Sequence, residues 1–215
     1  MIISMYKVIC ITNRHLCHGD FFKKIEQLAS NGADKIILRE KDLSEDEYRE
    51  LAKAVMKICR AYSTPCILHS FPDVALKLGA GGLHLPLHIL RNLSDEKRTK
   101  LITELPLLGA SCHSADEARE AEALGCNYII AGHIFETECK HGLQGRGLEF
   151  LKEVSEVVQI PIYAIGGITP KNIGEVINSG AQGACVMSGL MQAKNVDTYL
   201  NLLKFGGHKD EIYRG

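Results

Sequence analysis

A repeated segment, in which a glycine and a small residue come shortly before an apolar run, most strongly limits the folds open to this chain. The four copies begin at Gly32, Gly79, Gly125 and Gly180. Their spacing, about 46 to 55 residues, is typical of a repeated βαβα unit. A helical pattern ends at each glycine, so we expect all four at helix C-termini with positive φ angles.

Capping signals mark where several helices should begin. Each consists of a Ser, Thr or Asp placed just before an apolar helical stripe: Asp20, Ser44 with Glu47, Ser114 with Glu117, and Thr169 followed by Pro170. The two Ser-x-x-Glu pairs are capping boxes, and a proline after the cap favours the first helical position. These signals predict helices between the apolar runs.

Eight short apolar runs alternate with these helices. Four follow the repeated glycines, and the other four lie at residues 6–12, 66–69, 107–111 and 160–165. Strands that are apolar on both faces indicate a parallel sheet covered by helices. We therefore predict one α/β domain over residues 1–215, a (β/α)8 TIM barrel, with a polar tail prone to fraying from about residue 204. Only a short helix fits between the third and fourth strands, near residues 72–78.

A doubly wound open sheet is the competing architecture. No Gly-x-Gly-x-x-Gly turn follows the first strand, and such a turn is the usual dinucleotide-binding signal of that fold. The barrel is therefore the better prediction.

Charge, apolar runs and cysteine pattern exclude several classes of protein. The net charge is −1 at pH 7, which gives no field for nucleic acid or an anionic membrane surface. No signal peptide or long apolar span is present, and the eight cysteines form no Cys-x-x-Cys motif. We expect a soluble cytoplasmic protein with reduced cysteines, no membrane contact and no nucleic-acid partner.

In a TIM barrel the active site lies at the C-terminal ends of the strands. Gly166 and Gly167 follow the seventh strand, and Ser188 and Gly189 follow the eighth. Backbone amides in such loops commonly bind a phosphate group. The sequence therefore predicts a phosphorylated substrate, although the first two glycines would also suit a plain tight turn.

Basic side chains follow the second strand. Arg39 and Lys41 alternate along an extended segment, so both could point towards a second anionic group. They could equally be a solvated pair beside Asp42. The His15-Leu16-Cys17-His18 stretch after the first strand matches no familiar metal-site spacing, and we interpret it as a loop.

His133 follows the sixth strand directly after Gly132. A lone histidine there is commonly structural, but an imidazole can also take and return a proton near neutral pH. His84 and His113 also follow strands and could equally hold loops by hydrogen bonds. His133 is the strongest candidate for acid-base chemistry.

A set of motifs in chain order resembles the thiamine phosphate synthase/TenI superfamily. They are Leu38-Arg39-Glu40-Lys41, Gly82-Leu83-His84-Leu85, Ser111-Cys112-His113-Ser114, Gly132-His133-Ile134-Phe135, Ala164-Ile165-Gly166-Gly167-Ile168 and Val186-Met187-Ser188-Gly189. The resemblance spans nearly the whole chain. It implies a (β/α)8 barrel acting on a thiazole phosphate in thiamine biosynthesis.

The superfamily has two main activities, and this chain departs from the pattern of one of them. The synthase pattern has metal-binding carboxylates after the third and fourth strands, where this chain has His69-Ser70 and Ile89. Mg²⁺ prefers hard oxygen ligands, so a site without those carboxylates should bind a diphosphate substrate poorly. Asp73 survives nearby but is a poor replacement for a pair.

Residues 132–147 instead look closely like the TenI thiazole tautomerase. The resemblance implies that His133 is the catalyst, that no metal or organic cofactor is needed, and that the substrate is a phosphorylated carboxythiazole tautomer. It also implies a homodimer. The substrate-binding residues that it implies are Arg39, Lys41, Ser111, His113, Thr137, Lys140 and Gly147.

Three other functions stay open. They are thiamine phosphate synthesis from a pyrimidine diphosphate and a thiazole phosphate, non-catalytic binding of a thiamine precursor as a regulator, and an isomerase or aldolase reaction on another phosphorylated small molecule.

Overall fold

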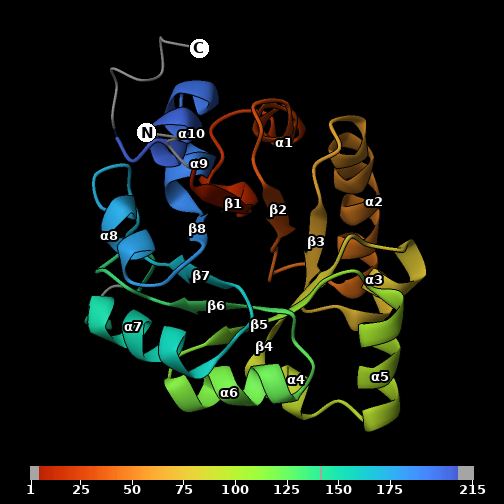
Figure 1. Ribbon diagram of the computed structural model, residues 1–215. Coiled ribbons are helices and arrows are strands. Elements are labelled where there is room, and N and C mark those ends of the chain that lie inside the picture. Colours follow the sequence, from red (N-terminus) through yellow and green to blue (C-terminus); the bar gives the residue numbers. More distant parts are fainter. Residues whose placement is uncertain (1–4, 141, 208–215) are drawn as a thin grey trace.

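The computed structural model describes residues 5–140 and 142–207, and they form a closed eight-stranded parallel barrel surrounded by helices (Figure 1). Every strand pairs with its neighbours in chain order, and β1 pairs with β8 to close the barrel. The strands are β1 (Lys7–Ile11), β2 (Lys35–Leu38), β3 (Cys66–His69), β4 (Leu83–Pro86), β5 (Leu108–Cys112), β6 (Tyr128–Gly132), β7 (Ile162–Ile165) and β8 (Gly183–Val186). The predicted TIM barrel is confirmed, and the open sheet is excluded.

Helices form the outer layer of the barrel (Figure 1). Within the described residues they are α1 (Phe21–Ser30), α2 (Glu45–Ala61), α3 (Pro72–Leu78), α4 (Leu87–Arg91), α5 (Asp95–Glu104), α6 (Ala115–Ala123), α7 (Gly147–Val157), α8 (Ile173–Asn178), α9 (Ser188–Gln192) and α10 (Val196–Lys204), with short 3-10 helices η1 (Arg14–Leu16) and η2 (Glu138–Lys140). The short helix expected between the third and fourth strands is α3. No described helix has both the length and the apolar character that a membrane span requires.

Alternating side chains separate the barrel interior from the layer beneath the helices. Ile37 and Ile67 belong to the interior cluster, together with Tyr128 and Tyr163. Gly109 leaves room for the Tyr128 ring, because a Cβ there would lie 2.2 Å from Tyr128 Cζ. Since side chains alternate along a strand, the next inward positions fall at the C-terminal ends of the strands. The site therefore begins directly above this apolar interior.

The repeated glycines have the predicted conformation. Their φ angles are positive, at 82° for Gly32, 56° for Gly79, 90° for Gly125 and 99° for Gly180. Each lies within two residues of a helix C-terminus, where an L side chain would be strained. The repeat therefore turns the chain from each helix into the next strand.

Capping signals gave most helix starts correctly. Asp20 accepts a hydrogen bond from the Lys23 amide, and Ser44 with Glu47 forms the complete capping box of α2. The second box is only half right: Ser114 caps α6, but Glu117 accepts from the His113 amide, at 2.6 Å, instead of from Ser114. That glutamate therefore also fixes the end of β5.

The predicted start of α8 at Pro170 was wrong. Asn172 Oδ1 accepts a hydrogen bond from the Thr169 amide at 2.8 Å, which holds residues 169–172 in a turn. The helix begins only at Ile173. Near the other predicted boundary, Lys204 ends α10 and forms an ion pair with Asp34, while residues 208–215 of the predicted tail lie outside the described residues.

Candidate active site

Two histidines and a serine form the polar floor of the barrel mouth. His84 Nε2 lies 2.8 Å from Ser111 Oγ, and His84 Nδ1 lies 3.1 Å from the Tyr128 hydroxyl. The His69 ring stacks on His84 at a centroid distance of 5.8 Å, and its Nδ1 lies 2.6 Å from Ser70 Oγ. Four neighbouring strands, β3 to β6, therefore contribute to one hydrogen-bonded layer.

Both histidines of this layer stay neutral at physiological pH. Burial lowers the pKa of His84 to about 3. Burial also lowers the pKa of His69 to about 2, with further contributions from His84, Arg39 and Lys41. The predicted loop-holding role of His84 thus becomes a fixed hydrogen-bonding role within the barrel floor.

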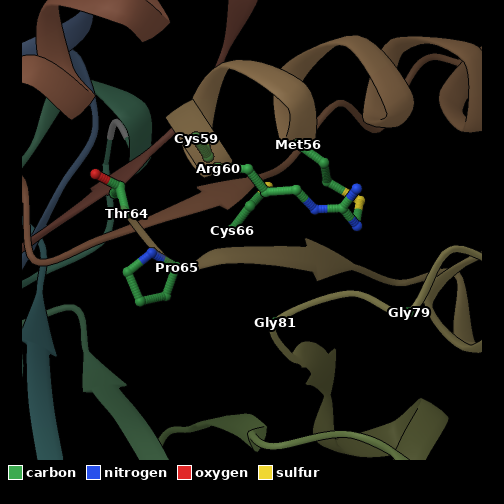
Figure 2. A pocket seen from close by; sticks show the side chains of 8 residues that line it. All are labelled: Met56, Cys59, Arg60, Thr64, Pro65, Cys66, Gly79 and Gly81. Atoms are coloured by element: carbon green, nitrogen blue, oxygen red, sulfur yellow. The ribbon is translucent and has the colours of Figure 1, made fainter. Parts of the chain in front are cut away.

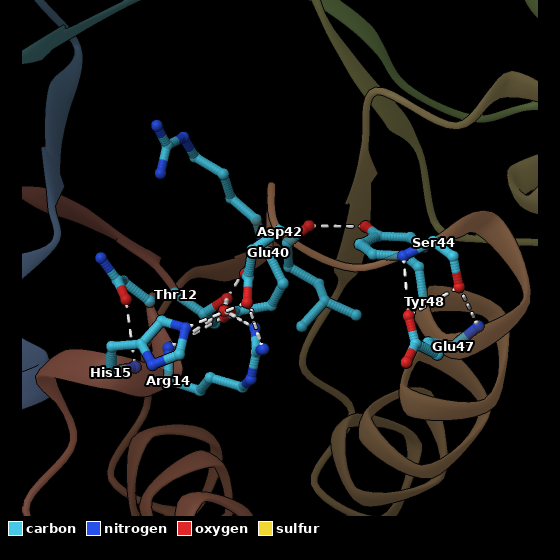
Figure 3. A network of polar contacts seen from close by, with 11 residues as sticks. Thr12, Arg14, His15, Glu40, Asp42, Ser44, Glu47 and Tyr48 are labelled. Atoms are coloured by element: carbon cyan, nitrogen blue, oxygen red, sulfur yellow. Dashed lines mark hydrogen bonds and ion pairs between the residues drawn. The ribbon is translucent and has the colours of Figure 1, made fainter.

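A buried carboxylate joins the loops after β1 and β2 (Figure 3). Glu40 is 3% exposed and accepts hydrogen bonds from Thr12 Oγ1 at 2.7 Å and from Arg14 Nη1 at 3.1 Å. Thr12 Oγ1 in turn accepts from the Arg39 amide at 3.0 Å. This network therefore holds the backbone of Arg39 in place.

The basic residues predicted to bind an anion lie close enough to repel one another. Arg39 lowers the pKa of Lys41 below its usual value, and partial burial and Lys140 lower it further. Lys41 and Lys140 come from loops after β2 and β6, far apart in sequence. Their grouping gives the site an excess of positive charge, which suits an anionic ligand. Asp42, which the alternative interpretation places beside this pair, forms ion pairs with Arg14 and His15.

His133 lies directly after β6, with 6% of its surface exposed. Its Nε2 is 3.3 Å from the carbonyl oxygen of Leu143, whereas its Nδ1 is buried and has no hydrogen-bond partner. A carbonyl can only accept, so a neutral ring carries its proton on Nε2 and leaves the Nδ1 lone pair free. Of the buried side-chain polar atoms in the described residues, Nδ1 alone lacks a partner.

The remaining predicted residues, His113, Thr137, Lys140 and Gly147, lie in the segments that follow β5 and β6. His113 Nδ1 lies 2.6 Å from the carbonyl oxygen of Gly132, so this ring contacts the end of β6. Gly147 begins α7 with a φ of 78°, and its amide donates to the Ile134 carbonyl. The Thr137 carbonyl accepts from the Lys140 amide at 2.9 Å. The amides of Arg146 and Gly147 donate to the carbonyls of His133 and Ile134, so residues 146–147 return to the end of β6.

The glycine turn after β7 aims successive amides in one direction. The carbonyls of Ile165 and Gly166 accept from the amides of Ile134 and Phe135, at 2.8 Å and 3.1 Å. Because C=O and the following N–H are antiparallel in a trans peptide, the amides of Gly166 and Gly167 point away from the β6 loop. Ile165 pairs with Cys185, so the turn lies beside the segment after β8, where Ser188 and Gly189 are the first residues of α9. The geometry is compatible with the predicted phosphate site.

The sequence missed two structural roles. Glu40 was part of a recognised motif, but its hydrogen bonds to the β1 loop depend on three-dimensional packing. The position of His69 could have been found, because it lies two residues after the inward-facing Ile67. Among the described residues, which include His15 to His18, no group of three His, Cys, Asp or Glu side chains is arranged to hold a metal ion.

A closed (β/α)8 barrel with imidazole, hydroxyl and cationic groups at the C-terminal ends of its strands is the architecture of the barrel enzymes. Comparisons with known proteins identify the family within this class of barrel enzymes. Residues 8–190 match the family model described as thiamine monophosphate synthase. The chain belongs to the thiamine phosphate synthase/TenI family of thiamine biosynthesis enzymes.

Relatives and solved structures agree with this assignment. The chain is 34% identical to thiamine-phosphate synthase of Clostridium acetobutylicum over 89% of this chain and 90% of the relative. It is 33% identical to the Fusobacterium nucleatum protein of the same name, over 92% and 96%. The thiamine phosphate pyrophosphorylase of Pyrococcus furiosus has a TM-score of 0.79 at 30% identity, covering 96% and 98% of the two chains. These names are those of synthases, not of tautomerases.

The synthase branch of the family implies Mg²⁺, and the residues present do not fit it. Where the resemblance places carboxylates, this chain has His69 and Ser70 after β3 and the partly buried Ile89 in α4. Asp73 forms an ion pair with Lys97 of α5, and its side chain is 58% exposed. Mg²⁺ prefers oxygen ligands, and the side chains at these positions offer few oxygen atoms for it.

Proposed function

We propose that this protein is a thiazole tautomerase, which converts a non-aromatic carboxythiazole phosphate into its aromatic tautomer. The observation that carries the proposal is the state of His133: one ring nitrogen lies against a carbonyl oxygen, and the other is buried without a partner. A general base needs such an unoccupied lone pair within reach of the proton that it removes.

The reaction suits a single imidazole. Nδ1 of His133 takes the proton from the ring carbon that carries the carboxylate, and the imidazolium then returns a proton to the exocyclic carbon. One C–H bond breaks, another forms and the double bonds shift, but no σ bond between two heavy atoms changes, so acid-base chemistry alone completes the step. Because Nδ1 is buried, the residues that cover it must move aside for the substrate to reach it.

Two anion subsites would orient the substrate around this base. The amides of Gly166 and Gly167, with Ser188 and Gly189 beside them, are the proposed phosphate site. The cationic group of Arg39, Lys41 and Lys140 is the proposed carboxylate site. Fixing both ends of the substrate would hold the ring carbon against His133 and lower the entropic part of the barrier.

Thiamine phosphate synthesis is the second candidate, because the named relatives are synthases. It requires residues other than the missing carboxylates to recruit Mg²⁺ for the diphosphate. A cytoplasmic location and a homodimer also remain predictions, as do the exclusion of nucleic-acid partners and membrane contact.

One experiment separates the two candidates. Purified protein is given the non-aromatic carboxythiazole phosphate without metal, and, in a second reaction, the pyrimidine diphosphate and thiazole phosphate with Mg²⁺. We expect aromatisation well above the uncatalysed rate in the first reaction and little thiamine phosphate in the second. The opposite pattern would overturn the tautomerase proposal in favour of the synthase.

A further inference from the structure

A cavity of about 200 Å³ lies beside the first residue of β3, and Figure 2 shows the residues that line it. The candidate active site lies at the other, C-terminal, ends of the strands. The cavity is bounded by the last turn of α2, the first residue of β3 and the loop before β4. Two cysteines, Cys59 and Cys66, line it together with Arg60, Thr64 and Gly81. None of these residues takes part in the proposed tautomerase chemistry.

The two cysteines lie at the junction of α2 and β3 and line the same cavity. The neighbouring Cys66 thiol lowers the pKa of Cys59, whereas Cys59 and burial raise the pKa of Cys66. Both are free thiols, 0% and 6% exposed, so the cavity is their access to solvent. A thiol of lowered pKa next to a second thiol is the usual arrangement of redox-active cysteines.

Another pair of buried cysteines provides a contrast within the same chain. Cys112 and Cys126 lie near each other, but the Cys112 thiol donates to the Glu117 carbonyl oxygen at 3.5 Å. Burial raises the pKa of both thiols, to about 12 for Cys126. Neither lines the cavity between α2 and β3. Cys59 and Cys66 therefore differ from this second pair in lining one solvent-accessible cavity and in the lowered pKa of Cys59.

We propose that Cys59 and Cys66 are a peroxide-reactive dithiol, which closes to a reversible disulfide between α2 and β3. The Cys59 thiolate attacks one oxygen of a hydroperoxide; the O–O bond breaks and leaves a sulfenic acid on Cys59 and hydroxide, or alkoxide, as the leaving group. The Cys66 sulfur then attacks the Cys59 sulfur, the S–O bond breaks, and water leaves. Overall, two thiols lose two electrons and two protons, and the peroxide is reduced.

The backbone around the pair is fixed at both cysteines. The Thr64 amide donates to the Cys59 carbonyl at 2.9 Å, and the Gly81 amide donates to the Cys66 carbonyl at 3.1 Å. Only six residues separate the cysteines, in a short turn from helix to strand. Because these hydrogen bonds hold the backbone, formation of an S–S bond of about 2 Å would rely mainly on rotation of the two side chains.

The test uses the native full-length protein and hydrogen peroxide. After a short exposure the remaining thiols are alkylated, the protein is digested without reductant, and the peptides are identified by mass spectrometry. We expect the peptides of Cys59 and Cys66 to be cross-linked, about tenfold faster than any loss of free Cys112 or Cys126, and to be released by dithiothreitol. The internal control is the Cys112 and Cys126 pair.

A single variant tests the order of the two steps. In Cys66→Ser, oxidation should stop at a sulfenic acid on Cys59, which a 1,3-dione probe traps, provided that circular dichroism shows a native fold. The proposal is overturned if Cys59 and Cys66 of the native protein stay reduced while the partly exposed Cys17 is oxidised, or if Cys59 pairs with another cysteine. If the variant does not fold, the mapping of the native protein decides alone.

Discussion

Gly166 and His133 touch so closely that no side chain fits between them: a Cβ on Gly166 would lie 2.3 Å from His133 Cβ and 2.8 Å from His133 Cα. Real Cβ atoms do not approach other heavy atoms so closely. The turn after β7 and the loop after β6 therefore share one contact. The proposed phosphate site and the proposed base are positioned by the same glycine.

Gly166→Ala should therefore lower the aromatisation rate by moving His133. The added methyl group meets backbone and Cβ atoms, which cannot rotate away, and the φ of 103° adds strain for any L residue. We expect kcat/KM to fall at least about a hundredfold, because misplacing a reacting group by about 1 Å can lower the rate by that factor. Steady-state kinetics with the tautomer as substrate measures this.

Gly79→Ala is the matched control, because Gly79 also has a positive φ but has open space around the position of a Cβ. The Gly79→Ala variant has a backbone strain of about 1 kcal/mol, but its new methyl group does not collide with another residue. Its activity should stay near that of the wild type. Equal losses in the two variants would show that strain, not displacement of His133, explains the effect.

Glu40→Gln should raise KM more than it lowers kcat. The substitution removes the charge that holds Arg14 and loosens the network behind the Arg39 backbone, while His133 lies on another loop. Loss of a buried charged hydrogen-bond partner should also lower the free energy of unfolding by about 1–3 kcal/mol. Urea unfolding and substrate kinetics check the two effects.

Asp42→Asn serves as the comparison for Glu40, because Asp42 pairs with the same arginine at an exposed position. Exposed ion pairs contribute little to stability. If Asp42→Asn raised KM as much as Glu40→Gln, the buried network would not be what positions Arg39.

The neutral histidines of the barrel floor should make the protein sensitive to acid. His84 in the unfolded chain takes up a proton near pH 6.5, whereas in the folded protein its pKa is about 3. Between about pH 6.5 and pH 3 only the unfolded chain binds this proton, so lowering the pH favours unfolding. Each unit by which the pH falls should lower the free energy of unfolding by about 1.4 kcal/mol through His84. Urea unfolding between pH 7 and pH 4 should show a shallower dependence in His84→Gln; equal slopes would contradict the assignment.

Lys140→Met should weaken binding of the carboxylated product selectively. A lost charge-assisted hydrogen bond of about 1.5 kcal/mol corresponds to about a tenfold weaker affinity. Calorimetric titration should show this loss for carboxythiazole phosphate but not for the thiazole phosphate that lacks the carboxylate. Lys152→Met, which removes an exposed lysine paired with Glu149, should change neither affinity. Equal weakening for both ligands would place Lys140 at the phosphate instead.

The barrel could be predicted from the sequence because its signals are local. A glycine that turns a helix into a strand, such as Gly32, needs a positive φ wherever it occurs, and Ser44 caps its helix through neighbours three residues away. The error at α8 came from a similar local competition, since Asn172 offers the Thr169 amide a turn that the sequence pattern does not reveal.

The site was predictable only in part, because its geometry depends on contacts between distant segments. The position of His133 follows from the end of a strand, but its unpartnered Nδ1 follows from how residues 142–146 fold back. Glu40 is bonded to residues 26 and 28 positions away in the chain. No pattern in a single sequence reports such contacts.

The most direct test of the proposed proton shift is the rate at which the aromatic ring appears in proton NMR, without metal, for the wild type and for His133→Asn. His15→Asn is the matched control, because His15 is an exposed histidine that pairs with Asp42. We predict that His133→Asn loses at least about a hundredfold in rate, as expected for removal of a general base, and that His15→Asn does not. A His133→Asn protein that folds normally and aromatises the substrate at the wild-type rate would contradict the account.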